Sequence, residues 1–358
     1  MDNIHEVQKY IPHDHHVCGY GRIIITSRDS NITAHRYINH TIAIGELTSE
    51  QKISLFSKII SDKTFNPEHI SNLLSTIPPF PLDVSIAAYY IKSTETSFTQ
   101  YIIDLNNNSN DFDNTQSLLL NETGDYNQTR YKIITLSLEH LISSHQDFKD
   151  LLLFIAMLDS QNIPRNLLDK YKNHVVVDSF IYNLKKYSLI AGESITPLGE
   201  VFNLHRSTQA IALAYLTQKL NLENNQKQFI NPIGKIFWSY VSNLVDNEDS
   251  AKIRLMLPHS KAFLSNTMLL TEETKILVEN AIGYIYYYLG FDLKAKQHLE
   301  ISLQKLQKYY GIDHIDPART VLFLAMAIRR IGDYKEAKRL LIQSADVSKK
   351  YPEYHMQH

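Results

Sequence analysis

A hydroxyl pair and an arginine follow directly on an apolar run near the start of the chain. The run 23–25 consists of three isoleucines, and Thr26, Ser27 and Arg28 come next. In an open α/β sheet ligands bind at the carboxyl ends of strands, and the forked guanidinium of an arginine there can hold a terminal phosphate. The pattern therefore indicates a phosphate contact. The alternative is an arginine that forms a salt bridge after an edge strand, and this fragment alone favours that alternative.

Two short strands and a helix start would position this group. Residues 22–27 are rich in β-branched side chains and follow Gly21, which predicts a strand, and residues 37–44 form a second candidate strand. Thr48 predicts a helix start, because Gln51 three residues later completes a capping box. Beyond Thr48 the apolar spacing is helical, and only 11 of 358 residues are glycine. Long helices with short turns are the expected result.

Composition narrows the class of protein. The chain is 44% hydrophobic and 21% charged, with a net charge of -2, which is ordinary for a globular protein and gives no polyanion-binding surface. The single cysteine, Cys18, excludes an intramolecular disulfide and fits a reducing compartment. The sequence shows no secretory signal at residues 1–6 and no apolar run long enough to cross a membrane. A cytoplasmic protein without nucleic-acid or membrane partners is therefore expected.

The middle of the chain predicts a helical bundle followed by a small hairpin. Helices are expected over 129–143, 148–158, 164–171 and 180–187. Two short strands, 189–191 and 194–196, would flank Gly192. Three helices followed by a hairpin are the layout of a winged helix.

The last part of the chain contains an internal repeat. Gly290 recurs as Gly332 and Ala295 as Ala337, and Leu299 also recurs as a leucine, each time 42 residues later. A fixed period of this length predicts a helical solenoid. The small residues would have a structural role, because they let two antiparallel helices approach closely.

Several segments resemble the NB-ARC class of STAND nucleotide-switch ATPases. Segment 21–29 is similar to the sensor strand of that class, and the resemblance implies that Arg28 senses a γ-phosphate. Segment 79–82 (Pro-Phe-Pro-Leu) stands where the class has its Gly-Leu-Pro-Leu motif, so Pro81 would pack against adenine. Segment 203–206 (Asn-Leu-His-Arg) resembles the Met-His-Asp motif, so His205 would contact the β-phosphate of bound ADP. Segment 309–320 resembles the junction between tetratricopeptide repeats of the 42-residue type.

One element of that class does not occur in the sequence. The phosphate-cradling loop Gly-x-x-x-x-Gly-Lys-Ser/Thr is absent from the 358 residues. Residues 1–4 look like the tail of the next family element, a strand whose acid, here Asp2, would hold Mg²⁺ indirectly. The chain thus resembles the latter part of a STAND protein. ADP or ATP with Mg²⁺ would be cofactors of a complete protein. For this chain by itself we expect weak contact with ADP at most, or no cofactor at all.

The expected fold is mainly α. It comprises a truncated α/β nucleotide-binding remnant over 1–47, a helical ARC-like domain over 48–125, a winged helix over 126–207 and tetratricopeptide-type repeats over 208–358.

Three functions stay open. The first is the regulatory or sensor portion of an ADP/ATP-dependent signalling switch, whose repeats bind a protein or peptide and which has no turnover alone. The second is a pure protein-binding scaffold with a vestigial nucleotide-binding region. The third, an active ATPase, requires another chain to supply the missing loop. Self-association is a further expectation, because an apolar strand edge invites it.

Other candidate residues have simpler interpretations. Segment 13–18 (His-Asp-His-His-Val-Cys) contains metal-ligand types, but its spacing fits no standard zinc pattern and favours a surface loop. The tyrosines at 284–288 and Trp238 are expected in the core. Segment 258–260 (Pro-His-Ser) predicts a helix start.

Overall fold

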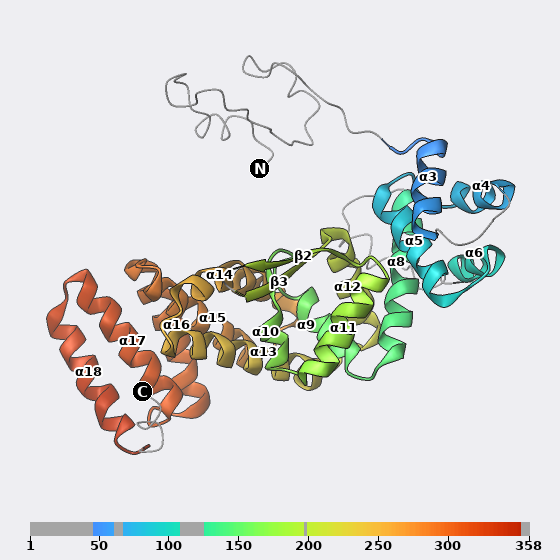
Figure 1. Cartoon of the computed structure of the whole chain (residues 1–358). Coiled ribbons are helices and arrows are strands. Elements are labelled where there is room, and N and C mark those ends of the chain that lie inside the picture. The colour runs from blue at the N-terminus through green and yellow to red at the C-terminus, as the bar shows by residue number, and fades with distance from the viewer. Residues whose placement is uncertain (1–45, 61–66, 108–124, 197–198, 352–358) are drawn as a thin grey trace, which may run out of the picture. The chain divides into compact units, whose positions relative to one another are not determined.

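The computed structural model describes residues 46–60, 67–107, 125–196 and 199–351 (Figure 1). The chain divides into two units after Glu46, and the second unit contains nearly all of the described residues. The expected remnant over 1–47, with Asp2, Arg28 and segment 13–18, therefore lies outside the described residues except at its last two positions. The described part is mainly α, as predicted.

The first described segment is helical. The capping box at its start is confirmed: the Thr48 N–H donates to Gln51 Oε1 (2.9 Å), and the Gln51 N–H donates to Thr48 Oγ1 (3.2 Å). Of the helices that follow, α6 is not among those predicted, because only Tyr101 and Leu105 of its described side chains are fully buried. The helices of this segment are α3 (Ser49–Ile60), α4 (Pro67–Ser75), α5 (Pro81–Thr94) and α6 (Phe98–Asn107).

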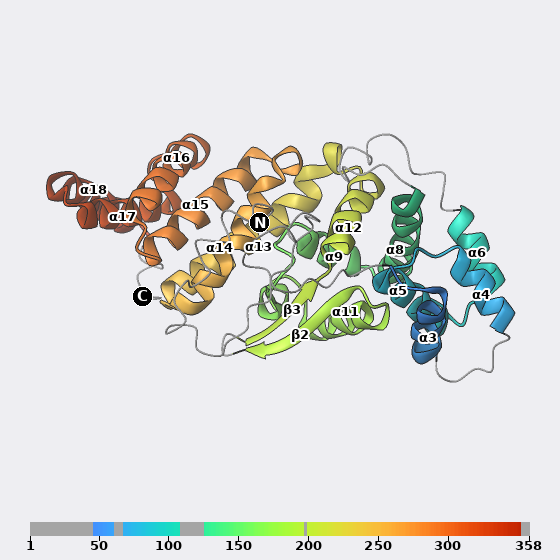
Figure 2. The ribbon, with the colours of Figure 1, turned by 90° about the horizontal axis from the view of Figure 1, so that it is seen from above.

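Three antiparallel strands and four helices follow. The strands lie in the order β1-β3-β2, so β3 is central, and Figure 2 shows α11 beside the β2–β3 hairpin. The elements in chain order are α8 (Asp125–Ser144), α9 (Phe148–Ala156), β1 (Ile163–Pro164), α10 (Arg165–Asp169), α11 (His174–Lys186), β2 (Ile190–Thr196) and β3 (Gly199–Leu204).

The prediction of two separate strands at 189–191 and 194–196 is wrong, because they do not pair with each other. Both predicted strands belong to β2, and the partner strand β3 lies beyond them, with Ile190 opposite Leu204 and Thr196 opposite Gly199. Gly192 is therefore not the turn; it adjoins an irregularity in the pairing, a place where glycine is common in strands. The positive φ of +107° falls instead at Gly199.

The rest of the described chain is helical. One expected start is wrong: α14 does not begin at Pro258 but at Ser250, where the Asp249 side chain accepts from the Lys252 N–H (3.2 Å). Pro258 lies inside α14, and the buried residues Ile253 and Phe263 hold this helix in the core. The elements are α12 (Arg206–Lys219), α13 (Leu222–Asp246), α14 (Ser250–Ser265), η4 (Thr267–Leu269), α15 (Glu272–Tyr288), α16 (Asp292–Tyr310), α17 (Ile315–Ile331) and α18 (Tyr334–Ser348).

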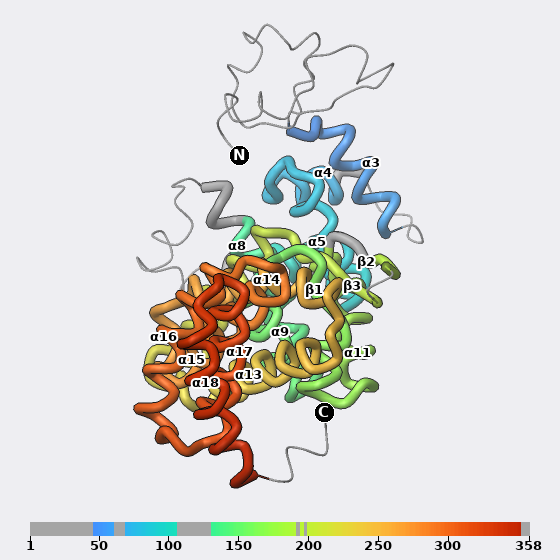
Figure 3. The backbone as a smooth tube through the Cα atoms, turned by 90° about the vertical axis from the view of Figure 1, so that its left-hand side faces the viewer, coloured from blue at the N-terminus to red at the C-terminus, as the bar shows by residue number. Residues whose placement is uncertain are grey.

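The 42-residue period of the sequence also appears in the helices and in the turns that join them. Helix α15 packs against α16, α16 against α17 and α17 against α18, and Figure 3 shows these helices side by side. The turns α15–α16 and α17–α18 each contain a glycine with positive φ, Gly290 (+78°) and Gly332 (+104°). Glycine suits this left-handed conformation because it has no Cβ to clash.

Helices α13 and α14 form an earlier pair with the same turn. Glu248, 42 residues before Gly290, also has a positive φ, of +52°. In all three turns the residue that follows donates its N–H to the carbonyl five positions back: Asp249 to Leu244 (3.0 Å), Phe291 to Tyr286 (2.9 Å) and Asp333 to Ile328 (3.2 Å). A buried serine recurs in the second helix of each pair, at 260, 302 and 344. The repeat therefore extends at least from α13 to α18.

Candidate functional site

Pro81 occupies the first turn of α5, where proline is favoured because no helical hydrogen bond needs its missing N–H. Its side chain is exposed. The preceding loop is held on both sides: the Leu47 N–H donates to the Pro79 carbonyl (2.7 Å), and the buried Lys52 ammonium donates to the carbonyls of Leu74 and Ile77. Burial lowers the pKa of Lys52.

A charged pair lies beside Pro81. Arg130 of α8 donates two hydrogen bonds to the carboxylate of Asp83, from Nε (3.0 Å) and Nη2 (2.9 Å), and stacks 4.8 Å from the Phe80 ring. Burial raises the pKa of Asp83, and Arg130 offsets part of that shift. This pair fixes the start of α5 on α8 and hence the position of the exposed proline.

His205 stands at the junction between β3 and α12. The preceding N–H of Leu204 donates to the Ser160 carbonyl (2.8 Å), and the His205 carbonyl accepts from the Gln209 N–H (2.9 Å). The imidazole is half-buried, and burial lowers its pKa, so the ring is neutral near pH 7. Among the described residues, no hydrogen bond or ion pair to this ring is found.

Pro81 and His205 are not in contact with each other. Pro81 is the first residue of α5, and His205 directly precedes α12; both helices pack against α8. In neither case does the local backbone depend on the Pro81 or His205 side chain for a hydrogen bond.

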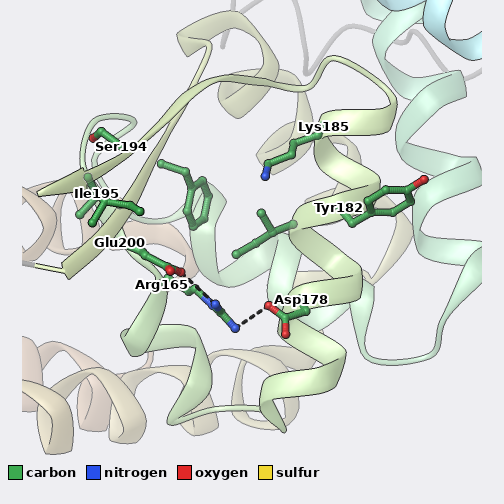
Figure 4. Close-up of a pocket in the computed structure, with 10 residues that line it drawn as sticks. Arg165, Asp178, Tyr182, Lys185, Ser194, Ile195 and Glu200 are labelled. Carbon is green, nitrogen blue, oxygen red and sulfur yellow. Dashed lines mark hydrogen bonds and ion pairs between the residues drawn. The ribbon is translucent and has the colours of Figure 1, made fainter.

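A pocket of about 370 Å³ opens between α11 and the β2–β3 hairpin. At one end Arg165 lies between Asp178 (2.5 Å) and Glu200 (2.9 Å), and Figure 4 shows Lys185 reaching in from α11. Neither Pro81 nor His205 lines this pocket. The residues that line it are Arg165, Asp178, Ile181, Tyr182, Lys185, Ser194, Ile195, Glu200, Val201 and Phe202.

The repeats align one face of α13, α15 and α17. We call this the A-helix face and define it by four positions that recur every 42 residues. In the middle helix this face is nearly closed, because Leu277, Asn280 and Tyr284 are at most 4% exposed, whereas Leu322 at the equivalent position to Asn280 is 37% exposed. The members are Lys235, Trp238, Ser242 and Asp246 on α13, Leu277, Asn280, Tyr284 and Tyr288 on α15, and Arg319, Leu322, Met326 and Arg330 on α17.

Asn280 joins three successive first helices of the repeats. Its Oδ1 accepts from Trp238 Nε1 on α13 (3.0 Å), and its Nδ2 donates to Thr320 Oγ1 on α17 (2.9 Å) and to Ser302 Oγ on α16 (3.2 Å). A buried carboxamide with all of these partners is favourable, whereas one that loses a partner is not. The network therefore fixes the register of neighbouring repeats.

An arginine crosses the same face. Arg319 of α17 forms an ion pair with Asp246 and donates to the Ser242 carbonyl (3.3 Å), both on α13, so it bridges over the intervening helix. Its guanidinium lies 5.5 Å from the ring of Tyr284 and 5.9 Å from that of Phe323. Cation–π attraction and the ion pair act together at this point.

The four repeat residues singled out in the sequence lie where helices meet or turn. Ala295 and Ala337 are 0% and 2% exposed, and Gly290 and Gly332 form the turns. Close approach is also allowed by Gly283, because a Cβ built there would lie 2.6 Å from Leu299 Cδ2.

The comparison with known protein families finds a match on this part of the chain. Residues 275–350 match the family described as tetratricopeptide repeat. A search among curated proteins found no match. A solved structure from Pyrococcus horikoshii, a STAND protein with a tetratricopeptide repeat sensor, aligns with 16% identity and a TM-score of 0.35 over 85% of this chain and 42% of that one. The chain thus spans less than half the length of that protein.

Residues 275–350 form tetratricopeptide repeats. The prediction of a 42-residue helical repeat is confirmed there, and the α13–α14 pair shares its turn geometry. Within the described ranges no helix could cross a membrane. Nor does any group of three or more His, Cys, Asp or Glu in the described ranges offer a metal site.

Sequence reasoning missed Asn280 and Arg319. Asn280 lies inside a helix without any motif. Arg319 belongs to segment 309–320, whose resemblance to a repeat junction gave this residue no role of its own, and Trp238 was predicted only as a lone core aromatic. The signal that connects them is the period itself, because Trp238, Asn280 and Leu322 are spaced by 42 residues. Aligning the repeats back to α13 would have placed them on one face.

Proposed function

We propose that this chain is the sensor and regulatory portion of a STAND-type nucleotide switch whose repeats bind a protein or peptide. The tetratricopeptide repeats at 275–350 carry the proposal, because stacked helical pairs present an extended surface that suits protein recognition. Binding would shift a switch equilibrium through different affinities for its two states.

The nucleotide part of the proposal rests on Pro81 and His205. The exposed ring of Pro81 is suited to pack against the flat face of adenine. The neutral, half-buried imidazole of His205 has an N–H available for a phosphate oxygen, because no polar partner in the described ranges occupies it. Both residues therefore fit ADP. Mg²⁺, Asp2 and Arg28 would take part only in a complete ATPase core, and the segment with α9–α11 and β1–β3 would act as its winged helix.

A binding experiment tests this proposal. Fluorescently labelled ADP is titrated into the full chain, alone and after mixing with a protein that carries the phosphate-cradling loop. We expect weak binding by the chain alone and a gain on mixing, because the loop supplies most phosphate donors. His205→Ala should abolish most of the gain. His174→Ala, at an exposed histidine on α11, is the matched control.

A protein-binding scaffold is the second candidate. The family match covers the repeats and no other segment, which favours it. The two candidates differ in one result. If His205→Ala changes neither ADP affinity nor assembly with the loop-bearing protein, while the repeats still bind a partner, the scaffold is the better description.

A further inference from the structure

One loop of the three-stranded segment contacts both the motif at 203–206 and the helical repeats. It comprises residues 158–162, between α9 and β1, and we call it the joint loop. On one side it bonds to the end of β3 and to the start of α12. On the other side it accepts a hydrogen bond from His259 of α14, the second helix of the α13–α14 pair. The joint loop therefore connects the motif to the repeats.

The residues just before His205 are bonded to the joint loop. The Asn203 side-chain oxygen accepts from the Asn162 N–H (2.6 Å), and the Leu204 N–H donates to the Ser160 carbonyl (2.8 Å). The loop thus holds the last two residues of β3, and with them the point at which the chain turns into α12.

The residues just after His205 return to the same loop. The Gln209 N–H donates to the His205 carbonyl (2.9 Å), and the Gln209 side-chain amide donates to the Leu158 carbonyl (2.6 Å). His205 therefore lies between two anchors on one loop. Its imidazole is half-buried, and burial lowers its pKa, so the ring responds to any change in how these anchors hold it.

Two bonds from different parts of the chain meet at Asn162. Its backbone has a positive φ of +54°, a conformation that asparagine adopts more readily than most residues. Its N–H donates to Asn203 on β3, and its carbonyl accepts from His259 on α14. A displacement of either partner is therefore felt at the same residue.

The His259 ring has a defined tautomer. A carbonyl oxygen only accepts, so the 3.1 Å contact between Nε2 and the Asn162 carbonyl places the proton on Nε2. The ring is 0% exposed, and its Nδ1 has no hydrogen-bond partner among the residues that the structure describes. Burial lowers the pKa of His259, so the ring is neutral near pH 7. A neutral replacement at this position therefore leaves the local charge unchanged.

We propose that Asn203 and His259 are positioning residues for His205 and that both act through the joint loop. Asn203 acts from the motif itself, two residues before the imidazole. His259 acts from the repeats, because a shift of α14 moves the donor on which the loop carbonyl depends. The proposal rests on the proposed function, since it names the contact through which the repeats regulate the same histidine.

A second contact joins the same two parts of the chain without touching the loop. The Tyr240 hydroxyl of α13 donates to Asn166 Oδ1 of α10 (2.7 Å), and Tyr240 is 5% exposed. Tyr240→Phe therefore removes one buried hydrogen bond between the repeats and the three-stranded segment and leaves the joint loop intact. It is the matched control for the loss of the His259 bond.

Four variants of the full chain test the proposal. His259→Leu removes the donor to the loop, and Asn203→Ala removes the acceptor on the motif. His259→Gln keeps an N–H donor at the reach of Nε2, and Tyr240→Phe is the control. Each variant exchanges one neutral side chain for another, so none adds a charge near His205. Circular dichroism shows which variants fold, and if one of the first two does not, the other carries the test.

The readout is the pKa of His205, followed by NMR in chain that contains isotope-labelled histidine. The signal is assigned by its loss in His205→Ala. In His259→Leu and Asn203→Ala the ring gains access to water, so its pKa should rise towards the ordinary value of about 6.5, by about 0.3 or more, a twofold change in proton affinity. In His259→Gln and Tyr240→Phe the pKa should stay at the wild-type value.

The outcomes separate this proposal from the proposed function. An unchanged pKa of His205 in both His259→Leu and Asn203→Ala overturns it. An equal rise in Tyr240→Phe overturns it as well, because a general loosening of the repeats then explains the change. A rise in Asn203→Ala alone overturns the role of His259. No nucleotide is present in these titrations, so a failure to bind ADP in the earlier experiment refutes the proposed function and leaves this result standing.

Discussion

Replacing Asn280 by alanine should loosen the repeats more than any other single polar substitution on the A-helix face. The substitution removes three hydrogen bonds, to Trp238, Ser302 and Thr320. Ser302 and Thr320 keep backbone acceptors at Leu299 (3.2 Å) and Asp316 (2.9 Å), so the group left without a partner is the indole N–H of Trp238. A stranded donor costs about 1–3 kcal/mol, and the small cavity adds to it. We expect a loss of about 2–4 kcal/mol in the free energy of unfolding.

The assay uses a probe that the sequence supplies. Trp238 is the only tryptophan in the chain, so its fluorescence during urea unfolding reports on the joint between α13 and α15. Gln304→Ala, at an exposed position on α16, is the matched control and should change stability by less than about 0.5 kcal/mol. The mutant emission should also shift, because the indole loses its acceptor.

A double-mutant cycle decides whether the reasoning is correct. In the Trp238→Phe background the indole donor is absent, so Asn280→Ala should cost about 1 kcal/mol less than in the wild type, as followed by circular dichroism. If the two losses simply add, the bond from Trp238 contributes nothing, and the account of the network is refuted.

Three further predictions concern buried groups. Gly283→Ala should destabilise the repeats by about 1–3 kcal/mol in urea, because its Cβ would meet Leu299; an unchanged midpoint would contradict the close packing. Burial lowers the pKa of His259, so the unfolded chain binds a proton that the folded chain refuses. Stability is then complete above about pH 6.5 and falls as the pH drops from there towards the folded pKa, and thermal unfolding of His259→Asn should show a flatter pH dependence. Arg130→Met should lose about 2–4 kcal/mol by leaving Asp83 buried and unpaired; adding Asp83→Asn should recover much of it, and a double variant as unstable as Arg130→Met would refute this.

The helices were predictable where the sequence holds a local signal. Thr48 and Gln51 bond to each other across a single turn, so these two residues suffice to define that helix start. The 42-residue period was equally readable, because the turns at Gly290 and Gly332 require a conformation that glycine adopts without strain. The hairpin was only half predictable. Its second strand, β3, owes its place to pairing with both β1 and β2, which a single segment cannot show.

The residues of the candidate site also fall into two groups, those that a short motif predicts and those that only the fold brings together. Pro81 and His205 were found from short motifs, and the structure gives each a defined backbone position without joining them. Asp246 and Asn280 belong to no motif. Arg319 belongs to segment 309–320, whose resemblance to a repeat junction does not indicate its contacts with α13.

The sequence by itself determined the helical class, the repeat period and the turns, because each depends on residues a few positions apart. The tertiary structure alone decided that Arg319 reaches α13, that Asn280 bonds to two neighbouring repeats and that the middle helix is covered. Those contacts join residues 40 to 77 positions apart. Their formation depends on how far each helical pair rotates against the next, and that angle is set by the packing of whole helix faces rather than by any local pattern.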